Sequence, residues 1–155
     1  MKRPNSSMQL TRAADYAVRV MVQLAASPKE QRVLLPDLAA VTDAPESFLS
    51  KVLQALSHEG LIDSKRGHSG GFQISNRGRR ASMREVIEAI DGPIMLNSCL
   101  ISGKACPRSS KCPAHPVWER AQMAMLNVLS QALISELALQ HVQPLYSLQA
   151  IGSAS

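Results

Sequence analysis

Residues 46–75, ESFLSKVLQALSHEGLIDSKRGHSGGFQIS, decide the fold of this chain. In the first half, apolar residues recur at the three- and four-residue spacing of one helix face: Phe48, Leu49, Val52, Leu53 and Leu56. Gly60 then supplies a stop of the kind that commonly ends a helix. In the second half, LIDS and FQIS are short alternating segments on either side of KRGHSGG, whose three glycines suit a turn. The stretch therefore predicts a helix followed directly by a β-hairpin.

The residues before this stretch supply a partner helix. LPDLAAV, with Pro36 at its opening, predicts a short helix, and TDAP separates it from the next one. Two short helices joined by a tight turn form a helix-turn-helix. A helix-turn-helix followed by a basic, glycine-bearing hairpin is the winged-helix arrangement. In it the second helix enters the major groove of DNA, and the hairpin lies along the backbone or in the minor groove.

Positive charge is concentrated around the predicted hairpin. The chain has 17 Lys and Arg against 12 Asp and Glu, a formal net charge of +5. Six basic residues and no acidic residue fall between positions 65 and 84: Lys65, Arg66, Arg77, Arg79, Arg80 and Arg84. Such a cluster is either a solvated surface or a phosphate-binding one, and its place on a predicted winged helix favours duplex DNA. Aromatic residues make up only 3%, which argues against stacking surfaces for single-stranded nucleic acid.

Further helices are predicted on both sides of this unit. Thr11 is positioned to cap a helix over RAADYAVRVMVQLAAS, and Ser82 with Glu85 forms a capping box that opens SMREVIEAIDG. From Val117 to Val142 no Gly or Pro interrupts an apolar pattern, which predicts one long helix. Because so apolar a helix has more surface than a small domain covers, we expect it to pair with the same helix of a second copy. Packing within one chain is the alternative.

All three cysteines of the chain lie in residues 99–118, CLISGKACPRSSKCPAHPVW, with the spacing C-x6-C-x5-C and His115 three residues after the last. Three thiols cannot all pair within one chain, and clustered cysteines without an export signal more often bind metal than form disulfides. Structural zinc sites usually have paired thiols about two to four residues apart. The wider gaps here favour an iron-sulfur cluster, while zinc and free regulatory thiols stay open as alternatives.

The predicted fold is mainly α with a small β-hairpin wing, in the form of a winged helix-turn-helix domain plus a long C-terminal dimerisation helix. Its predicted parts are a disordered N-terminus (1–7), the DNA-binding domain (8–92), a cluster-binding loop (93–118), the dimerisation helix (117–142) and a flexible tail (143–155). No apolar run approaches the roughly 20 residues that span a bilayer, and the N-terminus has no export signal. We therefore expect a cytoplasmic protein without a membrane partner.

The order of these parts resembles one family of bacterial regulators. LTRAADYAVRVM at the start, RGHSGGF in the hairpin, EVIEAIDGP and the cysteine segment with CPAHPVW are similar to the Rrf2 family of winged-helix transcriptional regulators, over residues 8 to about 142. The resemblance implies a homodimer that binds a palindromic DNA operator, senses nitric oxide, redox state or iron and cluster availability, and acts as a repressor. It also implies an iron-sulfur cluster, either 2Fe-2S or 4Fe-4S.

The same resemblance assigns ligands and DNA contacts to residues of this chain. It makes Cys99, Cys106 and Cys112 cluster ligands. The fourth ligand is His115 in IscR-like members and Asp15 of the partner subunit in NsrR-like members; this sequence has both and slightly favours Asp15. Without that role, Asp15 is a carboxylate that complements the positive end of the first helix. The implied DNA contacts lie on the second helix and the wing: Ser47, Ser50, Lys51, Lys65, Arg66, Gly67, His68, Gly70 and Gly71.

Two other functions compete with this interpretation. A winged-helix regulator with a structural zinc has the same DNA-binding part, and a small iron-sulfur electron carrier leaves the basic hairpin unexplained. An enzyme has little support, because no nucleophile or phosphate-loop motif is present and the four histidines are scattered along the chain: His58, His68, His115 and His141.

Overall fold

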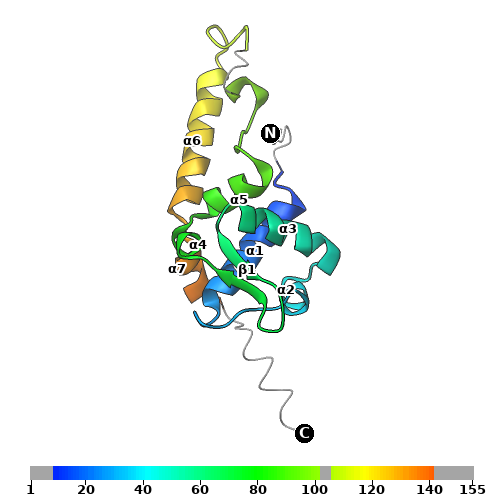
Figure 1. Cartoon of the computed structure of the whole chain (residues 1–155). Helices are drawn as coiled ribbons and strands as arrows, with labels where there is room; N and C mark the ends of the chain where they lie inside the picture. Colours follow the sequence, from blue (N-terminus) through cyan, green and yellow to red (C-terminus); the bar gives the residue numbers. More distant parts are fainter. Residues whose placement is uncertain (1–8, 102–105, 142–155) are drawn as a thin grey trace.

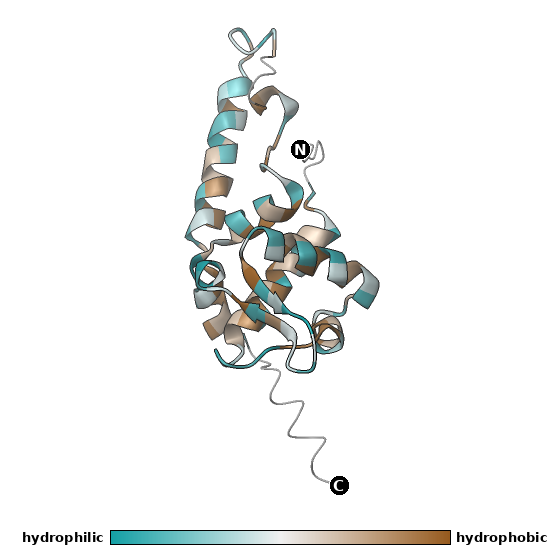
Figure 2. Cartoon of the chain, viewed as in Figure 1, coloured by the Kyte–Doolittle hydropathy of each residue, from teal (hydrophilic) through white to brown (hydrophobic). Residues whose placement is uncertain are grey.

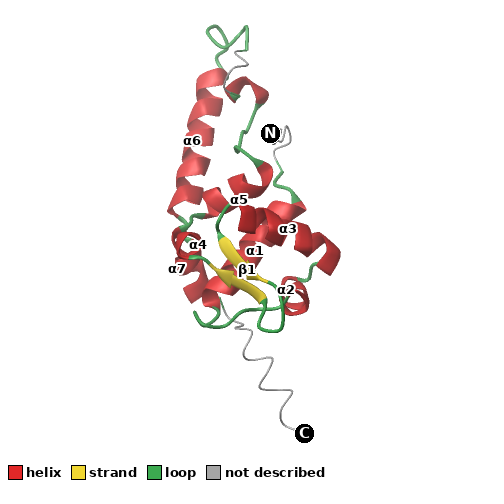
Figure 3. Cartoon of the chain, viewed as in Figure 1, coloured by secondary structure: helices red, strands yellow, loops and turns green. Residues whose placement is uncertain are grey.

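The computed structural model describes residues 9–101 and 106–141. Helices surround a two-stranded antiparallel hairpin, and one long helix extends away from this body (Figure 1, Figure 3). The elements are α1 (Arg12–Ala26), α2 (Leu35–Thr42), α3 (Glu46–His58), β1 (Ile62–Lys65), β2 (Gly71–Ile74), α4 (Asn76–Arg80), α5 (Met83–Asp91), the 3-10 turn η1 (Ser98–Leu100), α6 (His115–Gln131) and α7 (Ile134–Leu139). The predicted fold class, mainly α with a β-hairpin wing, is confirmed.

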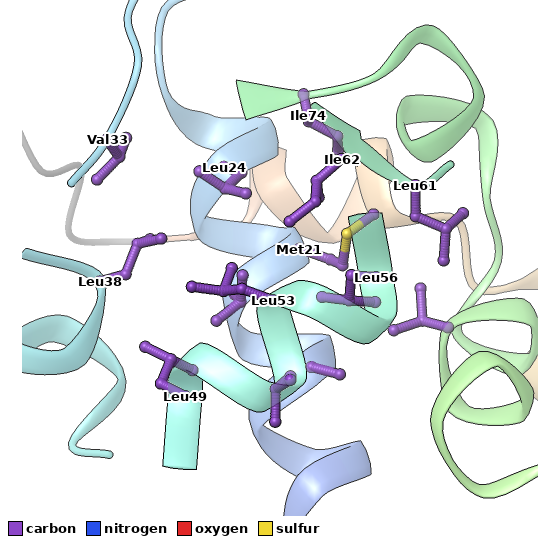
Figure 4. Close-up of a cluster of buried hydrophobic side chains, with 14 of the residues drawn as sticks. Met21, Leu24, Val33, Leu38, Leu49, Leu53, Leu56, Leu61, Ile62 and Ile74 are labelled. Atoms are coloured by element: carbon purple, nitrogen blue, oxygen red, sulfur yellow. The ribbon is translucent and has the colours of Figure 1, made fainter. Parts of the chain in front are cut away.

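The hydrophobic core lies around α1 and is shared by α3, the hairpin, α5 and α7. Met21 of α1 lies beside Leu53 and Leu56 of α3, and all three side chains are buried (Figure 4). The hydropathy colouring shows brown segments in these inner helices (Figure 2). Burial of a large apolar side chain contributes about 1.5–3 kcal/mol. Packing on α1 therefore contributes to the stability of the DNA-binding part.

The hairpin that the sequence predicts follows α3 directly. Ile62 pairs with Ile74 and Lys65 with Gly71, so that the loop 66–70 forms the tip. Val33, in the segment before α2, adds a short third edge: its N–H donates to the Phe72 carbonyl at 2.9 Å, and the Phe72 N–H returns a bond of 2.8 Å. The wing is thus tied to the helix-turn-helix by backbone hydrogen bonds as well as by side chains.

The predicted helix caps are confirmed. The Thr11 side chain accepts from the Ala14 N–H at the start of α1, and Ser82 and Glu85 form a reciprocal capping box at the start of α5. The short helix α4 was missed, because its sequence NRGRR contains a glycine and no apolar residue.

The prediction of one helix over 117–142 is wrong. The helix begins at His115, ends at Gln131, and resumes as α7 only at Ile134. At the break, the Met83 N–H donates to the Ala132 carbonyl at 2.8 Å, and the Ile134 N–H donates to the Ala81 carbonyl at 2.9 Å. These bonds to the segment before α5 replace the helical ones, and fully buried Ile134 brings α7 back onto the core. Tertiary contacts thus override an uninterrupted local helix pattern.

The predicted disordered N-terminus (1–7) and flexible tail (143–155) lie outside the described residues. Among the helices that are described, none is both long and apolar enough to cross a bilayer.

Candidate nucleic-acid interface and metal centre

Helix α3 presents a polar face opposite its buried one. Ser47 and Lys51 are exposed and Ser50 is half-buried, while the other side of the helix packs into the core. All three predicted contacts therefore lie in the first turns of α3, where the side chains of a recognition helix reach base edges.

Helix α1 braces the turn that precedes α3. The Tyr16 ring meets the Phe48 ring edge-on, with the centroids 5.7 Å apart, and its hydroxyl donates to the Asp43 carbonyl at 3.5 Å. The Arg19 guanidinium donates to the Thr42 carbonyl at 3.5 Å and lies over the Tyr16 ring. Asp43 itself has a positive φ of 53° and ends α2. These contacts fix the angle between α2 and α3.

The wing tip is exposed and tightly turned. The tip is exposed to solvent at Lys65, Arg66, Gly67 and His68. Gly67 has a φ of 97°, and a Cβ on Gly70 would lie 2.5 Å from the Lys65 carbonyl oxygen, so both positions require glycine. These glycines keep the turn at the tip tight, and the groove contact of the wing stays a prediction.

An arginine outside the wing fastens it to the body. One Arg32 nitrogen donates to the Asp63 and Gly71 carbonyls, both at 3.3 Å. Sequence reasoning missed Arg32, because its role depends on two carbonyls about 30 and 40 residues away along the chain.

Only part of the basic cluster at 65–84 is available for phosphate. Arg77 donates to the Glu59 carbonyl, Arg79 to the Ala25 carbonyl at 3.4 Å, and Arg84 pairs with Glu88 at 3.3 Å. Lys65, Arg66 and Arg80 have no such partner among the described residues and are exposed. The sequence prediction of a phosphate-binding surface is therefore narrowed to the wing tip and Arg80, because the other three of the six charges fasten helices.

The cysteines lie at the far end of the molecule, near the start of α6. Cys99 is in η1, whereas Cys106 and Cys112 lie in the turns that precede α6 (Figure 1). All three are half-buried free thiols. Cys99 and His115 line one hollow of about 410 Å³ together with Glu119, Gln122 and Met123 of α6. The structure thus brings one predicted thiol and the predicted imidazole to the same hollow.

His115 is held at the first turn of α6. Its backbone N–H donates to the Cys112 carbonyl at 3.2 Å, and its Nε2 lies 3.3 Å from a Glu119 carboxylate oxygen. The other ring nitrogen, Nδ1, is buried and has no hydrogen-bond partner among the described residues. A buried imidazole nitrogen without a partner is a costly arrangement unless something binds it.

Asp15, the other candidate for a fourth ligand, lies elsewhere. It is exposed on α1 and forms an ion pair of 2.8 Å with Arg19, one turn further along the same helix. Within one chain, α1 and the cysteine end of α6 are separate parts of the molecule (Figure 1). A role for Asp15 as a ligand therefore requires a second subunit.

The predicted ligands are of the right chemical types for a metal, but the structure does not gather them around one point. Three reduced thiols and a buried, unpartnered imidazole nitrogen are ligands that both zinc and iron-sulfur clusters accept. Over residues 9–101 and 106–141, however, no three thiol, imidazole or carboxylate groups converge on a single point. The predicted ligands are thus chemically suited but not gathered in this conformation.

Comparisons with known proteins agree with this geometry. Residues 10–140 match a family model named Rrf2 and described as an iron-dependent transcriptional regulator. NsrR, a helix-turn-helix transcriptional regulator of Geobacillus kaustophilus, is 29% identical over 84% of this chain and 89% of its own length. IscR of Klebsiella pneumoniae is 28% identical over 84% of this chain and 79% of its own length. The solved structure of CymR, the global cysteine regulator of B. subtilis, superposes with a TM-score of 0.70 at 22% sequence identity. The match covers 86% of this chain and 98% of the CymR chain.

Removal of the wing-tip charges tests this interface. For Lys65→Ala combined with Arg66→Ala, we expect the salt dependence of duplex binding to become less steep, by about 0.9 in log K against log salt for each phosphate that is no longer neutralised. Fluorescence anisotropy of a labelled non-specific duplex, titrated at several salt concentrations, measures this slope. Arg84→Ala is the matched control, because Arg84 is engaged with Glu88. An unchanged slope in the double variant would contradict the assignment.

Proposed function

Because this chain belongs to the Rrf2 family of transcriptional regulators, we propose that it is a homodimeric repressor whose DNA affinity follows the state of an iron-sulfur cluster. The coarser part is a family property: the chain is a DNA-binding winged-helix regulator and not an enzyme. The finer part rests on one observation: the segment with the three free thiols also carries His115, whose buried imidazole nitrogen lacks a partner among the described residues.

The cysteine segment supplies the ligands in this proposal. Cys99, Cys106 and Cys112 would hold the cluster, and His115 is the fourth ligand that the contacts favour. His115 has a free, buried nitrogen, whereas the Asp15 carboxylate is already paired with Arg19. When bound, the cluster would supply a centre that reacts with nitric oxide or oxygen and that is lost when iron is scarce. The sequence slightly favoured Asp15 as the fourth ligand, whereas this proposal favours His115. Asp15 of the partner subunit is the alternative.

Helix α6 supports the dimeric part of the proposal. None of its 17 residues is buried. Its half-buried apolar side chains Met125, Leu126 and Leu129 line hollows that α6 forms with the segment after α5. The opposite side carries an exposed apolar stripe at four- and three-residue spacing: Val117, Ala121, Ala124 and Val128. This spacing is that of a coiled-coil seam, which a second copy of the same helix fits.

The stripe gives a direct test of the dimer. We expect Ala124→Glu combined with Val128→Glu to convert the dimer to a monomer at micromolar concentration, since carboxylates from both copies would meet in a desolvated seam. Sedimentation velocity distinguishes one 16.8 kDa chain from two. Asn127→Glu adds one carboxylate between these positions but off the stripe, and it should leave the dimer intact. A wild-type monomer, or a dimeric double variant, would refute the proposed seam.

The regulatory switch needs only modest energy. A tenfold change in operator affinity corresponds to about 1.4 kcal/mol, and allosteric couplings are typically about 1–3 kcal/mol. The cysteine segment leads directly into α6. Loss of the metal group from this segment therefore has to change the free energy of DNA binding by only about this amount to act as a switch.

Substitution of a thiol tests the sensing function. We expect Cys106→Ala, after reconstitution with ferrous iron and sulfide without oxygen, to lose the visible absorption of the cluster and the response of DNA binding to nitric oxide. Ser110→Ala, in the same segment, is the matched control and should behave as the unmodified chain does. If Cys106→Ala retains both the absorption and the response, the sensing mechanism is wrong. Stoichiometric zinc in a colourless protein would favour a structural zinc site instead.

A further inference from the structure

The His115–Glu119 pair has a feature that metal-binding histidines share. The two residues are one helical turn apart on α6, and a Glu119 carboxylate oxygen lies 3.3 Å from Nε2 of His115. The His115 side chain is 18% exposed and that of Glu119 is 55% exposed, so the imidazole faces inward while the carboxylate approaches it from the solvent side. Histidines that bind metal through one nitrogen usually give the N–H of the other to a carboxylate, a backbone carbonyl or water.

A carboxylate at Nε2 decides where the imidazole proton resides. An ionised carboxylate only accepts hydrogen bonds, so Nε2 must carry the proton when it faces Glu119. Neutral imidazole has one ring proton, which leaves Nδ1 with its lone pair free. That atom is the one that is buried without a partner among the described residues. The contact of Glu119 with Nε2 and the unpartnered Nδ1 are therefore two independent observations with one consequence.

We propose that Glu119 is a positioning residue that fixes His115 in the Nε2–H tautomer and presents Nδ1 as the ligand atom to the metal group held by the cysteines. This inference rests on the proposed function for the identity of that group, but the tautomer itself belongs to the metal-free chain. Glu119 is not itself a ligand in this proposal.

The opposite wall of the hollow is also fixed by α6. Gln122 accepts the Leu96 N–H at 3.0 Å and donates to the Met95 sulfur at 3.4 Å. It thereby ties the segment that leads to Cys99 to the same helix that carries His115 and Glu119. Helix α6 consequently positions two of the four proposed ligands, one from its own first turn and one through Gln122.

The tautomer can be measured without any metal. Long-range proton–nitrogen correlation spectra of the full, reduced, metal-free chain at pH about 8.5, where imidazoles are neutral, report which ring nitrogen carries the proton. We expect a single Nε2–H form of His115 in the unmodified chain and in Glu119→Gln, whose amide oxygen still accepts the bond. Glu119→Ala should give a mixture of both tautomers. Glu136→Gln, an exposed glutamate of α7, is the matched control.

A cobalt(II) titration of the same reduced proteins measures how the tautomer of His115 affects metal affinity. We expect Glu119→Ala to raise the cobalt(II) dissociation constant by roughly 10- to 100-fold, and Glu119→Gln to restore most of the affinity. A proton on Nδ1 in the unmodified chain, a tautomer indifferent to Glu119→Ala, or a change in affinity below about twofold would overturn the inference. Failure of the unmodified chain to assemble a cluster from iron and sulfide would refute the proposed function instead, while the tautomer measurement still decides the role of Glu119.

Discussion

Met21 of α1 packs against Leu53 and Leu56 of α3, and this buried contact sets the position of the recognition helix. The same helix α1 reaches the turn before α3 through Tyr16, and it also packs against α5 and α7. Interiors packed at crystal-like density transmit displacements rather than absorb them. A shift of α1 relative to its neighbours would therefore move the DNA-reading surface with it.

Helix α1 also connects the two functional ends of the molecule. At its start, the Thr11 hydroxyl donates to an Asp91 carboxylate oxygen at 2.5 Å, and the Thr11 N–H donates to the other at 3.1 Å. Asp91 is the last residue of α5, directly before the segment that leads to Cys99. Two turns further along α1, Arg19 bonds to the Thr42 carbonyl at the helix-turn-helix. Helix α1 is thus hydrogen-bonded both to the end of α5 and to the helix-turn-helix.

Local signals predicted much of this fold. The caps at Thr11 and Ser82, the end of α3 near Gly60 and the hairpin depend on neighbouring residues, so local sequence patterns predict them. The break at Ala132 depends on backbone bonds to Ala81 and Met83, about 50 residues away, and no local pattern indicates it. For the same reason the arginines of α4 looked available for DNA, whereas Arg77 and Arg79 cap carbonyls of other helices.

The candidate site was predicted by residue type but not by arrangement. Spacing identified the cysteines and His115, and resemblance added Asp15. His115 has a buried nitrogen without a partner among the described residues, whereas the Asp15 carboxylate is paired with Arg19. This difference depends on burial and on the contacts with Glu119 and Arg19, which residue type alone does not give. The four-residue spacing of His115 and Glu119 was a usable signal, because residues four apart on a helix face one another. Whether the protein is a dimer that holds an iron-sulfur cluster is tested most directly by non-denaturing mass spectrometry of protein purified without oxygen. We predict a species with the mass of two 16.8 kDa chains plus iron and inorganic sulfide. A dimer that carries only zinc, or a chain without metal, would contradict the proposed cluster.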